Sequence, residues 1–270
     1  MTEVAATTSL DSGRVLLQEK GMDGVLHLRL NRPEKRNALN GQLVEALTEA
    51  LETASSNPEI RVLVLSGRGK DFCSGADLKE LEALAEMGVE DSLADAQRMG
   101  RLFLAMRNHP RPIVAAVQGR ALAGGCGLAT ACDMILADED ARFGFPEIHL
   151  GFVPAMVMTL LRRKVVEGAA FELVSMGRVI GASEAHRMGL VNRILPAESF
   201  DDGVAAFVGE LASRPPSALS LTKGLLYGLD ALSVEDGIGR GAEVNTLARM
   251  TRACREGVRE FLDRKREKEG

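Results

Sequence analysis

The first half of the chain alternates short apolar runs with amphipathic stretches. Residues 25–30 alternate apolar and polar side chains, whereas 62–65 and 113–117 are continuously apolar. Alternation is typical of a half-buried strand, and a short apolar run bounded by turns is typical of a strand buried on both faces. Between the first two runs, leucine and alanine recur at helical spacing, which predicts a helix over 41–55.

This alternation of strands and helices continues to residue 195 and then stops. Further strands are predicted at 134–137, 141–145 and 191–195. Further helices are predicted at 77–81, 93–107, 154–163, 168–176 and 183–189, the last capped by Ser183. Beyond Pro196 the pattern is helical only, with helices at 200–213, 217–229, 234–250 and 254–268. Alternating strands and helices predict an α/β fold.

Three parts follow from these patterns. Residues 1–12 are polar and are expected to form a flexible N-terminal tail. Residues 13–195 are expected to form the α/β core, and 196–270 a C-terminal helical region. The N-terminus lacks a signal-peptide pattern and no apolar run is long enough to span a membrane, so a cytoplasmic location is predicted.

Two glycine-containing turns are candidates for anion binding. The strand 113–117 leads through Gly124 and Gly125 into a predicted helix start, and the segment 73–77 resembles it elsewhere in the chain. A helix start exposes backbone N–H groups without internal partners, and glycine lets a ligand oxygen approach them. Each turn can offer one N–H to a shared oxygen. The pattern also fits two ordinary glycine turns.

Glu147 is the candidate proton carrier. Phenylalanine, proline, isoleucine and valine surround it in the sequence. A carboxyl group in an apolar setting has a raised pKa and can exchange a proton near neutral pH. The alternative is a loop glutamate that points to water.

The composition of the chain limits the classes of ligand and partner that it can be expected to bind. The chain has 270 residues, a net charge of −5, no tryptophan and one tyrosine, which disfavours a nucleic-acid partner. The four cysteines show no metal-ligand spacing and are expected to be reduced thiols. A serine hydrolase that uses Ser74 with His149 as base remains an alternative, although Ser74 lacks the nucleophile-elbow motif.

Five segments together resemble the enoyl-CoA hydratase/isomerase (crotonase) family, over about residues 14–266. The resemblance rests on the order and spacing of all five rather than on any one of them. They are Leu-Asn-Arg-Pro-Glu-Lys-Arg-Asn-Ala-Leu-Asn at 30–40, Phe-Cys-Ser-Gly-Ala-Asp-Leu at 72–78, Ala-Gly-Gly-Cys-Gly-Leu-Ala at 123–129, Ala-Arg-Phe-Gly-Phe-Pro-Glu at 141–147 and Ala-His-Arg-Met-Gly-Leu-Val-Asn at 185–192.

The resemblance implies a spiral of ββα units with a C-terminal helical region that builds homotrimers or hexamers. It implies that the N–H groups of Ala76 and Gly124 hold the carbonyl oxygen of an acyl-CoA thioester. No metal or redox cofactor is implied, because coenzyme A is part of the substrate. The implied substrate-binding residues are Ala76, Asp77, Leu78, Lys79, Gly124, Gly125 and, toward a neighbouring subunit's CoA, Phe261 and Arg264.

One departure from the family pattern bears on the reaction. Hydratases with two glutamates carry one in the Gly-Gly-Cys-Glu segment, and here that position is Gly127. Glu147 alone suits a shift of the double bond between positions 3 and 2 of an enoyl-CoA, although one acid can also add water by a cyclic transfer. His149 is a possible assistant. The prediction is an enoyl-CoA hydratase or isomerase of fatty-acid or related acyl-CoA metabolism, and the alternative is an acyl-CoA-binding protein without turnover.

Overall fold

The computed structural model describes residues 13–269, so the predicted tail over 1–12 lies outside the described residues. The strands are β1 (Leu16–Lys20), β2 (Val25–Leu30), β3 (Val62–Gly67), β4 (Ile113–Val117), β5 (Arg120–Leu122), β6 (Met134–Asp138), β7 (Arg142–Gly144), β8 (Val179–Gly181) and β9 (Arg193–Leu195). The α-helices are α1 (Gly41–Ser56), α2 (Leu78–Ala85), α3 (Val89–Asn108), α4 (Gly124–Ala131), α5 (Ala155–Leu161), α6 (Glu167–Ser175), α7 (Ala182–Arg187), α8 (Phe200–Ala212), α9 (Pro216–Gly228), α10 (Val234–Met250) and α11 (Arg252–Glu269).

The strands form two sheets. Six strands pair in the order β1-β2-β3-β4-β6-β9, and three pair in the order β5-β7-β8. In the larger sheet β1 is antiparallel to β2, and each later pair is parallel. In the smaller sheet β5 is parallel to β7, and β7 is antiparallel to β8.

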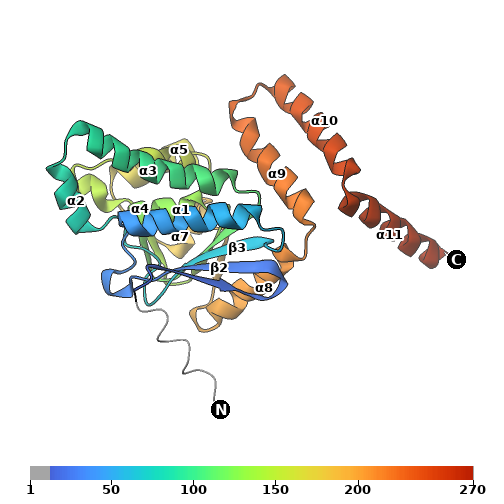
Figure 1. The fold of residues 1–270 in the computed structure, drawn as a ribbon, viewed down its shortest axis with the longest axis horizontal. Coiled ribbons are helices and arrows are strands. Elements are labelled where there is room, and N and C mark those ends of the chain that lie inside the picture. The colour runs from blue at the N-terminus through green and yellow to red at the C-terminus, as the bar shows by residue number, and fades with distance from the viewer. Residues whose placement is uncertain (1–12, 270) are drawn as a thin grey trace, which may run out of the picture.

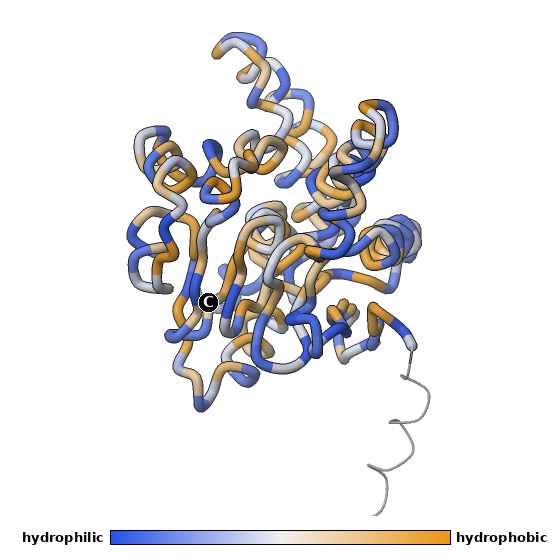
Figure 2. Tube along the Cα trace, turned by 90° about the vertical axis from the view of Figure 1, so that its left-hand side faces the viewer, coloured by the Kyte–Doolittle hydropathy of each residue, from blue (hydrophilic) through white to orange (hydrophobic). Residues whose placement is uncertain are grey.

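The central strands β3 and β4 of the large sheet are buried on both faces, which explains their continuously apolar sequences. In β3, Leu63 and Leu65 belong to the main core, whereas Val62 and Val64 pack with side chains of α8. Figure 1 shows α8 on one side of the sheet and α1, α3 and α4 on the other. The hydropathy colouring shows apolar segments running through the interior, while the outer helices alternate apolar and polar residues (Figure 2).

The C-terminal region divides into two parts. Helix α8 packs on the sheet and shares its second core, so it belongs physically to the α/β body although its sequence lies beyond residue 195. Helices α9, α10 and α11 instead project away from that body (Figure 1). The predicted role of this region in oligomer formation stays a prediction.

Several element boundaries differ from those expected. Strands β1, β5 and β8 were not predicted, because strands of three to five residues with few apolar positions carry little periodic signal. Helix α3 begins at Val89, four residues before the expected start. The assignment of Ser183 as a helix cap is wrong, because α7 begins at Ala182 after an extended Gly181 and Ser183 lies inside its first turn.

Candidate active site

Four extended segments pair side by side at one edge of the molecule: those around Leu39 and 73–76, and the strands β5 and β7. Leu39 forms a parallel bridge with Ala76, Cys73 forms one with Ala121, and β5 is parallel to β7. Because these segments run in the same direction side by side, their carboxyl ends meet at the same place. Ala76 lies in one of these segments, and Gly124 and Glu147 follow β5 and β7, so the pairing places all three residues at this edge although they are far apart in the sequence.

The turns after Cys73 and Leu122 interlock because glycine stands at their contact points. Gly75 has φ +101°, and a methyl group added to it would lie 2.9 Å from the Cβ atom of Ala123. A methyl group on Gly125 would lie 2.2 Å from the carbonyl oxygen of Cys73, which is a severe overlap. The two turns can approach this closely only without side chains at 75 and 125.

This packing places two free donors near each other. A methyl group added at Gly124 would lie 3.9 Å from the backbone nitrogen of Ala76. Within residues 13–269, neither of these two N–H groups donates to a protein acceptor, whereas Asp77 and Gly127 nearby do. Gly124 also begins α4, where the helix dipole favours negative charge. The pair can therefore bind one oxygen that gains negative charge during a reaction.

Glu147 lies just beyond β7 in the 3-10 helix η3 (Pro146–Leu150). Its side chain is half-buried, and its Oε2 atom is buried without a hydrogen-bond partner in the described structure. Burial raises the pKa of this carboxyl group, because the charged form loses solvation. Burial also raises the pKa of Cys126 in α4 to about 12, and the charge of Glu147 adds to that effect, so the carboxyl group lies near α4.

Gly127 occupies a tightly packed position one turn further along α4. A methyl group added there would lie 3.2 Å from Cγ2 of Val157 in α5 and 3.4 Å from Cζ of Phe103 in α3. Both of these side chains are buried. Two buried apolar side chains therefore pack tightly against position 127, where two-glutamate hydratases carry an acid.

The predicted substrate-binding residues 77–79 lie at the start of α2, next to Ala76. The carboxylate of Asp77 accepts a hydrogen bond of 2.8 Å from Arg32 and one of 3.1 Å from the N–H of Lys79. The hydrogen bond from Arg32 is the main cause that holds the pKa of Asp77 below its ordinary value. The side chains of Leu78 and Lys79 are exposed and therefore accessible to a ligand.

Arg32 is a residue of this region to which no role was assigned from the sequence. Besides Asp77, its guanidinium group donates to the carbonyl oxygen of Ala38 at 2.5 Å. It thus ties the segment after β2 to the segment that carries Ala76. The contact joins positions 45 residues apart, and no local sequence pattern could have revealed it.

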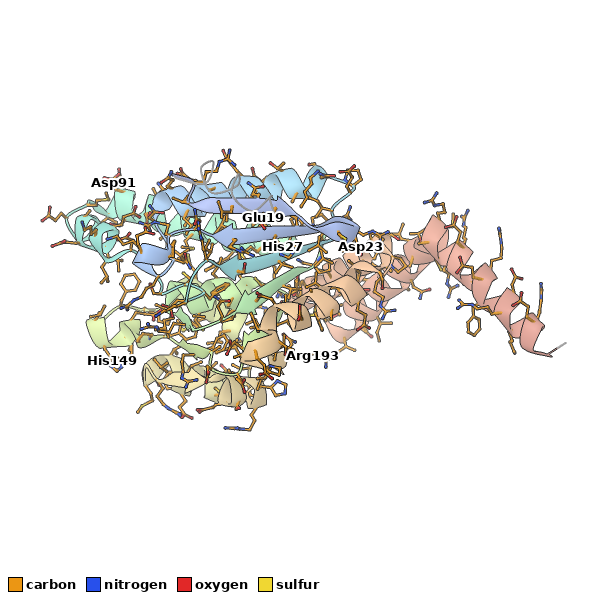
Figure 3. The ribbon with its side chains drawn as sticks, turned by 90° about the horizontal axis from the view of Figure 1, so that it is seen from below. Glu19, Asp23, His27, Asp91, His149 and Arg193 are labelled. Carbon is orange, nitrogen blue, oxygen red and sulfur yellow. The ribbon has the colours of Figure 1, made fainter. Side chains whose placement is uncertain are left out.

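The structure does not bring Phe261 and Arg264 to this edge within one chain. Both are exposed on α11. That helix lies at the end of the molecule opposite to α2 (Figure 1) and opposite to His149, which closely follows Glu147 (Figure 3). A role for these two residues in this chain's own site is excluded by that separation, and a role toward a neighbouring subunit stays a prediction.

The geometry offers no support for a serine nucleophile. The N–H of Ser74 donates to the carbonyl oxygen of Arg36, and no hydrogen bond joins its hydroxyl group to a histidine within the described chain. His149 is exposed, and its ring lies so close to Gly177 that a methyl group there would be 2.7 Å from Nε2. The described contacts therefore do not assemble the serine–histidine pair that this alternative needs.

The described residues also show no cluster suited to bind a metal ion and no thiol activated by a lowered pKa. Residues 13–269 contain no group of three or more His, Cys, Asp or Glu side chains arranged to hold a metal ion. The four cysteines are free thiols, and burial raises the pKa of Cys73, Cys126 and Cys132 to about 12. No helix in the described range has the length and apolar character required to cross a bilayer.

The fold is α/β, and its candidate site combines two neighbouring backbone N–H groups that have no acceptor in the described chain with the desolvated carboxyl group of Glu147. A family model described as enoyl-CoA hydratase/isomerase matches residues 20–268. The chain belongs to the enoyl-CoA hydratase/isomerase family.

Relatives and solved structures agree with that assignment over almost the whole chain. A Thermus thermophilus protein whose name also refers to an enoyl-CoA hydratase is 42% identical over 247 residues, covering 92% of this chain and 97% of the relative. The 2,3-dehydroadipyl-CoA hydratase of Escherichia coli is 35% identical over 242 residues, covering 89% and 93%. The crystal structure of an enoyl-CoA hydratase from Mycobacterium smegmatis superposes with a TM-score of 0.89 at 34% identity, covering 93% and 97%. The predicted crotonase-like fold is confirmed.

Proposed function

We propose that the protein binds an enoyl-CoA so that the N–H groups of Ala76 and Gly124 hold the thioester oxygen while Glu147 transfers a proton on the acyl chain. Removal of a proton from C2 makes an enolate, whose negative oxygen is stabilised by the two donors. The observation that supports this proposal most strongly is the carboxyl group of Glu147, which is desolvated and has no hydrogen-bond partner for its buried Oε2 atom. It lies just after β7, at the edge where the N–H groups of Ala76 and Gly124 have no acceptor in the described chain.

The reaction that one carboxyl group supports best is a shift of the double bond from position 3 to position 2. Glu147 takes a proton from C2, the electron pair spreads over a dienolate, and the same carboxyl group returns the proton to C4. The sum of atoms is unchanged and no water is consumed. The apolar packing of Val157 and Phe103 against Gly127 supports this proposal, because an acidic side chain at position 127 would have to displace buried apolar groups.

Hydration of a 2-enoyl-CoA is the second candidate. It is favoured by the names of relatives, which include the Escherichia coli hydratase above and a crotonyl-CoA hydratase from Syntrophomonas wolfei that is 34% identical over 260 residues. In this case Glu147 would accept a proton from water as the oxygen adds to C3 and would deliver a proton to C2. The same oxyanion site serves both reactions.

Further parts of the proposal concern binding and assembly. Residues 76–79 would line the path of the CoA moiety, with Gly124 and Gly125 at the thioester. No metal or redox group is proposed, because Glu147 moves the protons in both candidate reactions and the two N–H groups stabilise the negative oxygen; hydration also forms the bond between the water oxygen and C3. A cytoplasmic homotrimer or hexamer is proposed, in which Phe261 and Arg264 on the projecting α11 reach the CoA bound by a neighbouring subunit.

The decisive experiment compares two substrates. Purified protein is given a 3-enoyl-CoA and, separately, a 2-enoyl-CoA, and the products are separated by chromatography. Formation of 2-enoyl-CoA from the first supports isomerisation, and formation of 3-hydroxyacyl-CoA from the second supports hydration. Tight binding of both without turnover supports the acyl-CoA-binding alternative, and thioester hydrolysis that is lost in Ser74→Ala supports the hydrolase.

The pH dependence of turnover should report the raised pKa of Glu147. As a base it must be ionised, and burial moves its ionisation to higher pH. We therefore expect kcat/KM to rise with pH through a midpoint above about 4.3, the value for a solvated glutamate. Initial rates across a buffer series test this. A midpoint at or below that of a solvated glutamate would contradict it.

A glutamate placed at position 127 as the only change is expected not to create hydratase activity. In Gly127→Glu the new Cβ atom meets Val157 and Phe103, so we expect a loss of about 1–3 kcal/mol in unfolding free energy and no gain in hydration. The double variant with Val157→Ala should recover stability and gain hydration. Gly209→Glu in α8, where a Cβ meets nothing within 4 Å, is the matched control for stability.

A further inference from the structure

Ala123 has a backbone conformation that an L-residue rarely adopts. Its φ is 50° and its ψ is −125°. Asp23 and Arg36 also have positive φ, but their ψ values of 25° and 38° lie in the left-handed helical region that non-glycine residues occasionally visit. The angles of Ala123 match the first central residue of a type II′ turn, a position dominated by glycine. Such strain persists only where surrounding contacts enforce it.

Three contacts enforce the conformation of Ala123. Its N–H donates to the carbonyl oxygen of Gly144 at 2.8 Å, and its own carbonyl oxygen accepts from the N–H of Gly127 at 2.9 Å. Its methyl group lies against Gly75, where an added methyl would be only 2.9 Å away. Strand β7, helix α4 and the turn that carries Ala76 therefore all hold this one residue.

The conformation of Ala123 sets the direction of the Gly124 N–H group. The carbonyl group of Ala123 and the N–H of Gly124 belong to one planar peptide unit and point in opposite directions. Because the carbonyl oxygen is bound inside α4 by Gly127, the N–H of Gly124 points away from that helix. The methyl group at the same time fixes the spacing between this turn and the turn of Ala76.

We propose that Ala123 is a positioning residue, whose strained backbone and methyl wedge hold the Gly124 N–H at a fixed distance and angle from the Ala76 N–H. The proposal rests on the proposed function, because it assigns to Ala123 the alignment of that oxyanion site. The methyl group contributes by contact with Gly75 and not by contact with substrate. Alignment of donors before the reaction is what makes them effective on developing charge.

The test is Ala123→Gly, which relieves the strain and removes the wedge. We expect an unchanged or higher melting temperature together with a kcat lower by about 10-fold to 100-fold and a smaller rise in KM. Ala123→Ser, which keeps a Cβ atom, should restore most of kcat. A merely structural role would instead lower stability and kcat together, and that result, or a wild-type kcat in Ala123→Gly, would overturn the proposal.

Two further measurements separate this proposal from the proposed function. Affinity for a saturated acyl-CoA should fall in Ala123→Gly, whereas affinity for its thioether analogue, which lacks the carbonyl oxygen, should not; equal changes for both would overturn the proposal. Asp23→Gly, at a site well separated from His149 (Figure 3), should relieve a positive φ without changing kcat. If Glu147→Gln abolishes turnover while Ala123→Gly does not alter it, the proposed function stands and this inference fails.

Discussion

Replacing Glu147 with glutamine is expected to lower kcat on enoyl-CoA by about 10²-fold to 10⁴-fold with little change in KM. The amide cannot accept the proton from C2, whereas the two backbone donors that bind the thioester oxygen remain in place. Its similar size should keep the packing of η3 intact. Steady-state kinetics with a 3-enoyl-CoA and with a 2-enoyl-CoA measure the effect on both candidate reactions.

The stability of the same variant serves as its internal control. The raised pKa of Glu147 means that the folded state binds its proton more tightly than the unfolded state does. This contribution to stability is present below the unfolded pKa and is lost as the pH rises through the folded pKa, so the ionised form disfavours folding at neutral pH. Glu147→Gln should therefore melt at the same or a higher temperature at pH 7.

A matched surface variant completes that test. Glu49→Gln changes an exposed glutamate on α1 and should leave both kcat and the melting temperature at their wild-type values. The assignment of Glu147 as the proton carrier would be wrong if Glu147→Gln kept the wild-type kcat while remaining folded.

Replacing Lys223 with methionine is expected to destabilise the protein by about 3–5 kcal/mol, because it strands a buried charge. The ammonium group of Lys223 donates to Oδ2 of Asp133 at 2.8 Å, and the two side chains are 7% and 10% exposed. Tyr227 donates to the other carboxylate oxygen at 2.6 Å. Without Lys223, the carboxylate of Asp133 keeps hydrogen bonds only from the neutral donors Tyr227 and the N–H of Ile113, and the contact between α9 and the start of β6 is weakened.

Equilibrium unfolding in urea measures this loss, and two further variants interpret it. Lys20→Met breaks a surface pair with Glu59 of 3.4 Å between side chains that are 68% and 76% exposed, so it should cost no more than about 1 kcal/mol. The double variant Asp133→Asn/Lys223→Met removes both charges and should recover part of the loss. Equal costs for Lys223→Met and Lys20→Met would refute the role given to the buried pair.

The Lys223–Asp133 pair also explains how the C-terminal helices are attached to the α/β body although most of their length projects from it. Lys223 also donates to the carbonyl oxygens of Met106 and Arg111, so α9 is fixed to the core near its middle. Arg107 stacks 3.5 Å over the Tyr227 ring and pairs with Asp230 at 2.7 Å. These polar contacts hold the base of the projecting helices, while many of their apolar side chains stay exposed in the single chain, including Ile238, Met250 and Phe261.

Local sequence patterns predicted many of the strands and helices correctly. The reason is that a helix or strand with one buried face must repeat apolar residues at the spacing of that element. Strand β2 and helix α10 have the expected bounds, and β4 was predicted from one apolar run. Helix α1 was found from leucines that recur on one face, the face that is buried in the structure. The segments that carry Ala76, Gly124 and Glu147 were also singled out, because glycine turns and an acid among apolar residues are visible in sequence.

By itself, the sequence determined the α/β class, the strands buried on both faces and the family resemblance, since each depends on residue types at short separations. The tertiary structure alone decided which strand ends share an edge, because pairing between β5 and β7 or between Leu39 and Ala76 joins distant segments. It likewise decided the Arg32–Asp77 ion pair and the tight packing of Val157 against Gly127. The strained backbone of Ala123 is held by contacts with β7, with α4 and with the turn that carries Ala76. Because these elements are separate in the sequence, no local sequence pattern predicts their contact.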